Sequence, residues 1–432
     1  KTTRGPITFN HQYGGENYDA RRETIGWTHA AFDDKAWSAA AEVDAPGIGA
    51  EKARLMLAPQ PPDKIARTFP QQKVTQPAPG VFVYDLGQNM SGWPLINVSG
   101  TAGTVVKLTP GELLDAKGLV TQRSSGSPVW YSYTLSGHGE EQWHPEFSYY
   151  GFRYVQVTGA VPADSAATGP VAANTAVLHA LAGQFVHADV AAAGEFSCSS
   201  DTLNRIHALI NNAILSNTQS ISTDCPHREK LAWLEQTHLM GQAIMMNWNV
   251  RGLYEKIEND IADAQHANGL IPDIAPEYAK FSQGFLDSPE WGSAGVISPW
   301  YAYLYYDDQK ILSDHYDTMK RYVDYLGSRS KDNIVAYGLG DWYDVGPKSP
   351  GPAQLTSEAL TCTAVYYQDL LILQKTAALL GKTDDAQQYG AAAQAVRTAF
   401  NARFLDDATN QYEKGSQTAN AMPLAVGLVP DD

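Results

Sequence analysis

The chain has 432 residues, too many for one ordinary domain, and 44% of them are apolar, which suffices for two or three cores. Its 31 lysines and arginines face 47 aspartates and glutamates, and the resulting formal charge of −16 argues against nucleic acid and anionic membrane surfaces as partners. The three cysteines lack metal-binding spacing, and no apolar run is long enough to span a membrane. We therefore expect no metal ion and no cofactor.

Short alternating segments separated by glycine, proline and asparagine fill the chain up to about residue 195. Segments such as 80–87 and 152–157 have the length and the alternation that are typical of strands. This pattern predicts a β-sandwich domain over 76–194. The signals in 1–75 are weaker and that segment holds several prolines, so we predict part of a separate N-terminal β-domain there.

Beyond about residue 195 the apolar residues recur with the period of a helix. Leu203, Ile206, Ile210 and Ile214 share one face behind a cluster of serine and aspartate that can cap a helix. We expect about eight helices in this region, several of them joined by long loops rich in tryptophan, aspartate and glycine. Long decorated loops favour an (α/α)6 toroid with its site at the loop ends over an ordinary helical bundle.

The densest group of chemically useful side chains is the run 224–236, which reads Asp-Cys-Pro-His-Arg-Glu-Lys-Leu-Ala-Trp-Leu-Glu-Gln. Pro226 suits the opening of a helix and Asp224 its cap. In a helix that begins there, Glu229 and Trp233 would share one face. An indole and a nearby carboxylate favour the protonated form of Glu229, which a general acid needs at neutral pH. The alternative is an ordinary charged helix start with local ion pairs.

Two later loops also place a carboxylate beside a tryptophan. Glu290 precedes Trp291 in one, and Asp341 precedes Trp342 in the other, with glycines close by. Glycosidases use paired carboxylates for the chemistry, and aromatic faces hold the sugar ring between them. Tryptophans that only fill the centre of a toroid are the alternative. Three such clusters, in a chain with 10 tryptophans and 23 tyrosines, predict a carbohydrate site.

The run from Asp224 to Trp233 resembles the signature of bacterial α-L-rhamnosidases, glycoside hydrolase family 78. The runs 85–93 and 147–154 resemble motifs of that family's β-sandwich, and 416–421 resembles a late helix of its toroid. The resemblance implies β-sandwich domains followed by an all-α (α/α)6 toroid over 195–432 that hydrolyses terminal α-L-rhamnosyl residues with inversion. It implies a rhamnose-containing oligosaccharide, polysaccharide or glycoside as partner, and we expect a periplasmic or secreted protein.

The same resemblance assigns roles within the motif. Counted back from Trp233, Glu229 falls at the family's general acid. We therefore predict Glu229 as the catalytic residue, and as substrate-binding residues Asp224, His227, Arg228, Trp233, Glu235, Glu290, Trp291, Asp341 and Trp342.

Some positions depart from the commoner pattern of the family. One residue fewer separates the motif's arginine from its tryptophan, and Gln236 and Ser293 stand where many members carry aspartate. Glu235 and Glu290 could compensate. The family's general base lies in a late segment beyond Asp432, and about eight helices is fewer than the twelve of a full toroid. The toroid is thus expected to be incomplete in this chain and to lack its base, with Glu290 and Asp344 as fallback candidates.

Three other functions stay open. A lyase on the same fold would split rhamnose from glucuronate, with His227 as proton carrier and Arg228 as a clamp on the uronate carboxylate. Another toroid glycosidase would act on glucose-type substrates. A non-catalytic protein would bind sugar in the aromatic pocket without turning it over.

Overall fold

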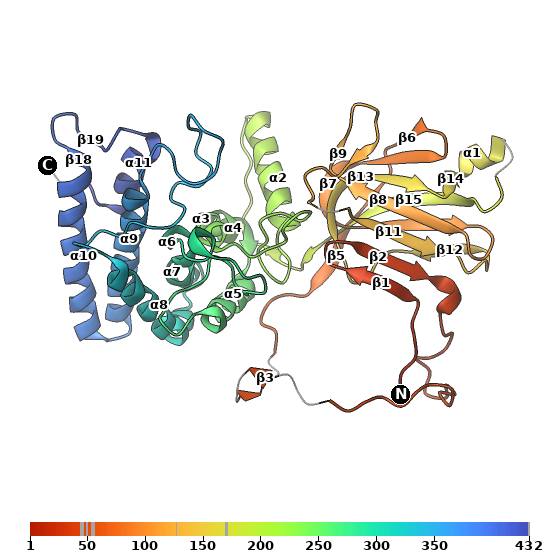
Figure 1. Ribbon diagram of the computed structural model, residues 1–432, viewed down its shortest axis with the longest axis horizontal. Coiled ribbons are helices and arrows are strands. Elements are labelled where there is room, and N and C mark those ends of the chain that lie inside the picture. Colours follow the sequence, from red (N-terminus) through yellow and green to blue (C-terminus); the bar gives the residue numbers. More distant parts are fainter. Residues whose placement is uncertain (44–46, 49–50, 53–56, 127, 169–171, 431–432) are drawn as a thin grey trace.

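The computed structural model describes residues 1–43, 47–48, 51–52, 57–126, 128–168 and 172–430. It has a sheet-rich N-terminal part and a helical C-terminal part, which lie side by side (Figure 1). The predicted change of character near residue 195 is confirmed, because the last strand before it ends at Ala192 and the first long helix begins at Asp201.

Most strands of the N-terminal part belong to one sheet. These are β1 (Ile7–His11), β2 (Gly15–Asp19), β5 (Asp63–Pro70), β6 (Lys73–Ala78), β7 (Val81–Ser99), β8 (Val105–Gly111), β11 (Trp130–Thr134), β12 (Glu140–Trp143), β13 (Tyr150–Thr158), β14 (Ala160–Pro162) and β15 (Ala176–Ala188). The main order is β1-β2-β11-β8-β13-β7-β15-β14, with β6 and β12 paired to β7 and β5 paired to β15.

Short two-stranded ribbons complete the strands. They are β3 (Gly47–Ile48) with β4 (Glu51–Lys52), β9 (Leu113–Leu114) with β10 (Val120–Thr121), β16 (Ala191–Ala192) with β17 (Trp248–Asn249), and β18 (Leu405–Asp406) with β19 (Gln411–Tyr412). The ribbon of β16 and β17 joins the end of the sheet part to the helical part.

The long strand β7 organises the sheet. Its alternating buried side chains include Ile96 and Val98, which are fully buried. Its first half pairs with β13, and from Gly92 onward it pairs with β15. The pairing of β7 with β13 has an irregularity between Phe152 and Tyr154, and such irregularities bend strands. The buried side chains of β7 belong to one apolar core that several neighbouring strands share.

Within 1–75, β3 and β4 pair only with each other, whereas β1, β2 and β5 belong to the large sheet. β2 runs parallel to β11, with Gly15 opposite Trp130, and β5 runs antiparallel to β15. In both pairs the two strands lie far apart in sequence, so local strand propensity cannot predict that they pair. Strands β1, β2 and β5 of the predicted N-terminal β-domain thus belong to the same sheet as the strands that follow them.

Gly15 gives a direct test of the β2–β11 pairing. Its φ is +95°, and an added Cβ would lie 1.8 Å from the carbonyl oxygen of Trp130. Gly15→Ala should therefore lower the free energy of unfolding by about 3 kcal/mol through strain and collision. Gly80→Ala is the control, because Gly80 has a φ of +71° but no atom within 4 Å of the added Cβ. Equal losses in denaturant titrations of the two variants would contradict the pairing.

The region predicted to be helical holds α2 to α11, somewhat more helices than the expected eight. The helices are α1 (Ala163–Thr168), α2 (Asp201–Ser216), α3 (Leu234–Leu239), α4 (Gly241–Asn247), α5 (Arg251–Ala264), α6 (Pro289–Gly292), α7 (Ala294–Tyr306), α8 (Gln309–Arg329), α9 (Glu358–Leu379), α10 (Thr383–Phe404) and α11 (Gln417–Val426), with 3-10 turns η1 (Ala20–Arg22) and η2 (Gln283–Phe285). Among the residues described, no helix has both the length and the apolar character needed to cross a membrane.

The apolar face predicted for α2 exists but does not face a core. Leu203, Ile206 and Ile210 are 51%, 45% and 42% exposed, and only Ile214 is buried. By contrast, α5, α7, α8, α9 and α10 share one continuous cluster of buried apolar side chains. In Figure 1, α2 and α10 lie at opposite ends of the helical part.

Candidate functional site

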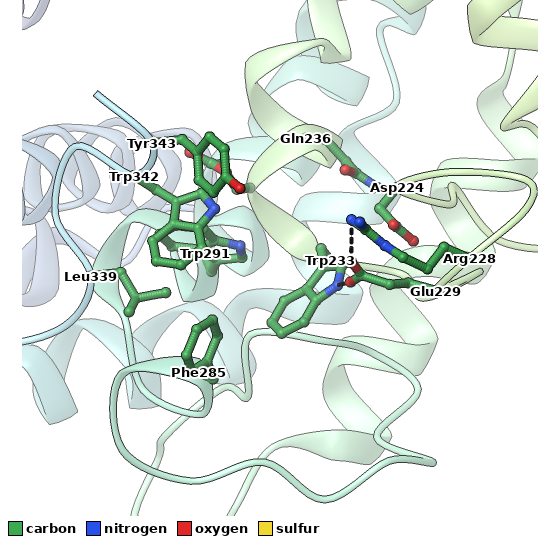
Figure 2. Close-up of a pocket in the computed structure, with 11 residues that line it drawn as sticks. Asp224, Arg228, Glu229, Trp233, Gln236, Phe285, Trp291, Leu339, Trp342 and Tyr343 are labelled. Atoms are coloured by element: carbon green, nitrogen blue, oxygen red, sulfur yellow. Dashed lines mark hydrogen bonds and ion pairs between the residues drawn. The ribbon is translucent and has the colours of Figure 1, made fainter. Parts of the chain in front are cut away.

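A cavity of about 460 Å³ opens in the helical part where several loops meet. This volume lies in the range of small-molecule sites. Figure 2 shows Trp291, Trp342 and Tyr343 on one side of it and Trp233, Glu229 and Arg228 on the other. The lining residues are Asp224, Arg228, Glu229, Trp233, Glu235, Gln236, Phe285, Trp291, Leu339, Trp342 and Tyr343.

The motif that begins at Asp224 is a closed turn, and the prediction of a helix from Pro226 is wrong. The backbone N–H of Asp224 donates to the carbonyl of Leu231 at 3.0 Å, and its Oδ1 accepts from the N–H of Leu231 at 2.9 Å. Lys230 has a φ of +52°, which breaks any helical path. Helix α3 begins only at Leu234, because the aspartate closes a loop on its own backbone and does not cap a helix.

Glu229 nevertheless contacts Trp233, as the spacing predicted. Its Oε2 accepts a hydrogen bond from the indole Nε1 at 2.8 Å, and its Oε1 lies 2.9 Å from a guanidinium nitrogen of Arg228. About a third of the side chain is exposed, at 33%. The indole contact agrees with the expectation, and the ion pair with Arg228 is the kind of local pair that the alternative interpretation of this motif expected.

Glu235 is the second carboxyl group in the cavity. It lies in the first turn of α3. Burial, together with the nearby carboxylates of Glu290 and Asp341, raises the pKa of Glu235 from its ordinary value of 4.5 to about 7. The cavity thus combines a carboxylate held by two donors with a carboxyl group that keeps its proton close to neutrality. Environments that separate two carboxyl groups in this way suit acid–base chemistry.

Aromatic side chains form a connected wall around the cavity. The ring centroids of Trp233 and Phe285 are 6.3 Å apart, and Phe285 meets Trp342 edge-on at 5.3 Å. Tyr343 continues the wall 5.5 Å from Trp342, and Trp291 contributes from a buried position. Flat apolar faces beside polar groups are suited to sugar rings, whose C–H faces stack and whose hydroxyls form hydrogen bonds.

Hydrogen bonds join the three loops that supply these residues. The carbonyl of Asp273 accepts from the N–H of Leu234 at 2.8 Å, and its Oδ1 accepts from the N–H of Ser288 at 2.9 Å. The Ser288 hydroxyl oxygen in turn accepts from the N–H of Leu339 at 2.9 Å. Because Asp273 and Ser288 are buried, these bonds fix the loops relative to one another.

Seven of the ten residues predicted for the site line the cavity, and His227, Glu290 and Asp341 do not. The Nε2 atom of His227 lies 3.9 Å from Glu112, and its ring packs edge-on against Tyr150 in the sheet part. The turn at 225–230 directs the histidine away from the cavity, since a helix did not form.

The other two predicted carboxylates act from outside the lining. Glu290 is buried and accepts hydrogen bonds from Thr361 at 2.6 Å and from the Cys362 thiol at 3.2 Å. Asp341 does not line the cavity, but its charge contributes to the raised pKa of Glu235. Of the fallback bases, Asp344 accepts from the backbone N–H groups of Gln354 and Leu355 at 3.0 and 2.9 Å and does not line the cavity.

Four lining residues were not predicted. Gln236 and Tyr343 directly adjoin predicted residues, so their position in the motifs was an available signal. Phe285 and Leu339 have no polar signal and reach the cavity through the loop contacts. Within the described residues, no group of three histidine, cysteine, aspartate or glutamate side chains could hold a metal ion.

Three family models of bacterial α-L-rhamnosidase domains match successive segments of the chain. Residues 191–432 match the family model of the bacterial alpha-L-rhamnosidase 6 hairpin glycosidase domain. Residues 75–179 match the bacterial alpha-L-rhamnosidase concanavalin-like domain, and 1–63 match the alpha-L-rhamnosidase N-terminal domain. The first of these models alone covers more than half of the chain.

Several relatives carry the name alpha-L-rhamnosidase. One from Streptomyces avermitilis is 34% identical over 99% of this chain and 39% of its own length, and one from Formosa agariphila is 32% identical over 100% and 46%. The solved alpha-L-rhamnosidase of Dictyoglumus thermophilum has a TM-score of 0.88 at 35% identity, with 100% of this chain and 47% of that chain covered. The Streptomyces avermitilis structure complexed with L-rhamnose has a TM-score of 0.87 at 33% identity, with 99% and 39% covered.

This chain spans less than half the length of these relatives. The matches nevertheless extend over its sheet part and its helical part in the same order. The resemblance inferred from the motif at Asp224 is confirmed, and the chain belongs to the bacterial α-L-rhamnosidase family.

Proposed function

We propose that the protein hydrolyses terminal α-L-rhamnosyl residues of glycans or glycosides, and that the sugar binds in the aromatic cavity. The observation that supports this most directly is Glu229, held between Arg228 and Trp233 at the cavity wall. A relative with 33% identity was solved with L-rhamnose bound. Rhamnose has an apolar face and several hydroxyls, which match stacked indoles beside charged groups.

The proposed mechanism uses Glu229 as general acid toward the leaving oxygen. In the free protein Arg228 and Trp233 hold the Glu229 carboxyl group at the cavity wall. Asp224 and Glu235 would bind hydroxyls from the same side of the cavity, and Glu235 would donate a hydrogen bond while it is protonated.

Inversion requires a second, ionised carboxylate that activates water across the ring, roughly 6.5–9.5 Å from the acid. Glu235 is assigned here to the sugar hydroxyls, Glu290 is buried among Thr361 and Cys362, and Asp344 does not line the cavity. We therefore propose that the base is supplied by a residue outside 1–432. The greater length of the relatives is consistent with this.

We also propose the domain limits 1–75, 76–194 and 195–432, with a β-sandwich in the second and an (α/α)6 toroid in the third. The exposed apolar face of α2 supports the toroid, because in a closed ring of helices that face would be covered by a neighbour. The long β7, which changes partners along its length, supports a sheet folded into two layers.

Release of free rhamnose from an aryl rhamnoside by the whole protein tests the proposal. Rhamnose without an unsaturated uronate signal in the ultraviolet is the expected result. An unsaturated product would instead favour the lyase, although the position of His227 outside the cavity argues against its role as proton carrier there. Cleavage of a nitrophenyl glucoside but not the rhamnoside, or binding of rhamnose without turnover, would contradict the proposal.

A further inference from the structure

Lys230, the residue after Glu229, is buried where the helical part meets the sheet part. Only 1% of it is exposed. Its ammonium donates to the carbonyl of Gln12, in the turn between β1 and β2, at 2.7 Å and to the carbonyl of Tyr149 at 2.6 Å. Lys230, at the end of the turn 225–230, thereby connects two segments of the sheet part that are far apart in sequence.

Three tyrosine rings surround the same ammonium. Its nitrogen lies 4.6 Å from the ring centroid of Tyr149 and 5.8 Å from those of Tyr13 and Tyr150. Burial lowers the pKa of Lys230 to about 7, whereas the ring faces and the two carbonyl acceptors favour the cation. Burying a charged ammonium costs desolvation energy, and an apolar side chain of similar size would fill the same space without that cost. The contacts of Lys230 therefore indicate a role beyond filling space.

The backbone of the turn is held as firmly as the side chain. The Tyr13 hydroxyl donates to the carbonyl of Glu229 at 2.7 Å, and the Tyr278 hydroxyl donates to the carbonyl of Lys230 at 3.0 Å. The two hydroxyl oxygens are 3.1 Å apart. Lys230 also keeps a positive φ, a conformation that is strained for a residue with a Cβ and that persists only where the surroundings impose it.

We propose that Lys230 and Tyr13 are positioning residues, which lock the backbone of Glu229 so that its carboxyl group points into the sugar cavity. The N-terminal β-hairpin is then part of the active-site architecture. This inference rests on the proposed function of Glu229 as general acid. Lys230 has a positive φ and its side chain lies against the sheet, whereas the neighbouring Glu229 lines the cavity. Contacts of Lys230 on the sheet side of the turn therefore fix the position of Glu229 on the cavity side.

The test uses Lys230→Met, which keeps the stem and removes the ammonium, and Tyr13→Phe, which removes one hydroxyl and keeps the ring. In the whole protein, both should lower kcat for alkyl rhamnosides roughly 10–100-fold, because a displaced acid fails where the leaving group needs a proton. KM for the alkyl rhamnosides should stay unchanged. The kcat for a dinitrophenyl rhamnoside should also stay unchanged, because this leaving group needs little proton donation. Tyr18→Phe is the matched control, since Tyr18 in the same hairpin donates to Glu23 and not to the turn.

Amide hydrogen exchange across 224–233 gives a second readout that does not depend on turnover. Both variants should exchange faster there than the wild type, and Tyr18→Phe should not. Equal loss of kcat on both substrates, or unchanged exchange in the turn, would overturn the positioning role. If the wild type hydrolyses no rhamnoside, the proposed function fails, and the exchange experiment still decides whether Lys230 and Tyr13 lock the turn.

Discussion

Glu229→Gln is expected to reduce turnover of rhamnosides with poor leaving groups by roughly 10²–10⁴-fold while binding survives. Glutamine keeps the size of the side chain and can still accept the indole hydrogen bond from Trp233, but it cannot carry a proton to the leaving oxygen. Steady-state kinetics on alkyl and dinitrophenyl rhamnosides, together with calorimetric titration of rhamnose, measure both parts. The effect should be small for dinitrophenyl rhamnosides, which leave without assistance.

The same experiment with Glu235→Gln separates the two carboxyl groups of the cavity. If Glu229→Gln retains turnover of alkyl rhamnosides and Glu235→Gln loses it, the proton donor is Glu235. That outcome would be chemically reasonable, because the pKa of Glu235 is raised to about 7, close to the operating pH at which a general acid is most effective. Glu229 would then not be the general acid, but the sugar would still bind in the same cavity, which both glutamates line.

Glu235→Gln is also expected to change the pH dependence of stability. The pKa of Glu235 rises from 4.5 to about 7 on folding, so the folded state binds the proton more tightly than the unfolded state. Relative to the glutamine variant, the wild type is unaffected below pH 4.5 and loses stability progressively as the pH rises through 7. Above that pH the difference should reach about 3 kcal/mol in favour of the variant.

Denaturant titrations at several pH values between 4 and 9 measure this difference. Glu255→Gln provides the control, because Glu255 lies exposed on α5 and its replacement should leave the free energy of unfolding nearly unchanged at every pH. A constant offset between wild type and Glu235→Gln across the range would show that Glu235 is not desolvated in the folded protein.

Apart from the turn at 225–230, the sequence determined which regions form strands and which form helices, and it identified the family. Alternation with period two in segments such as 80–87 and a helical period after Ser199 follow from which faces of each element are buried, and both appear where they were expected. The motif from Asp224 to Trp233 identified the family because its residues are contiguous. The contact between Glu229 and Trp233 could likewise be predicted, since only three residues lie between them and keep the two side chains close in a turn as in a helix.

Only the tertiary structure decided how the site is assembled. The turn at Lys230 contacts Gln12, Tyr13 and Tyr149, and His227 in the same turn lies beside Glu112 and not in the cavity. Spacing within the motif contains no information about partners that lie 81 to 218 residues away. Charge shows the same limit: Glu235 and Glu229 are both glutamates in the motif. Burial beside other carboxylates raises the pKa of Glu235, whereas Glu229 pairs with Arg228 and Trp233, because the contacts of an ionisable group are set in three dimensions.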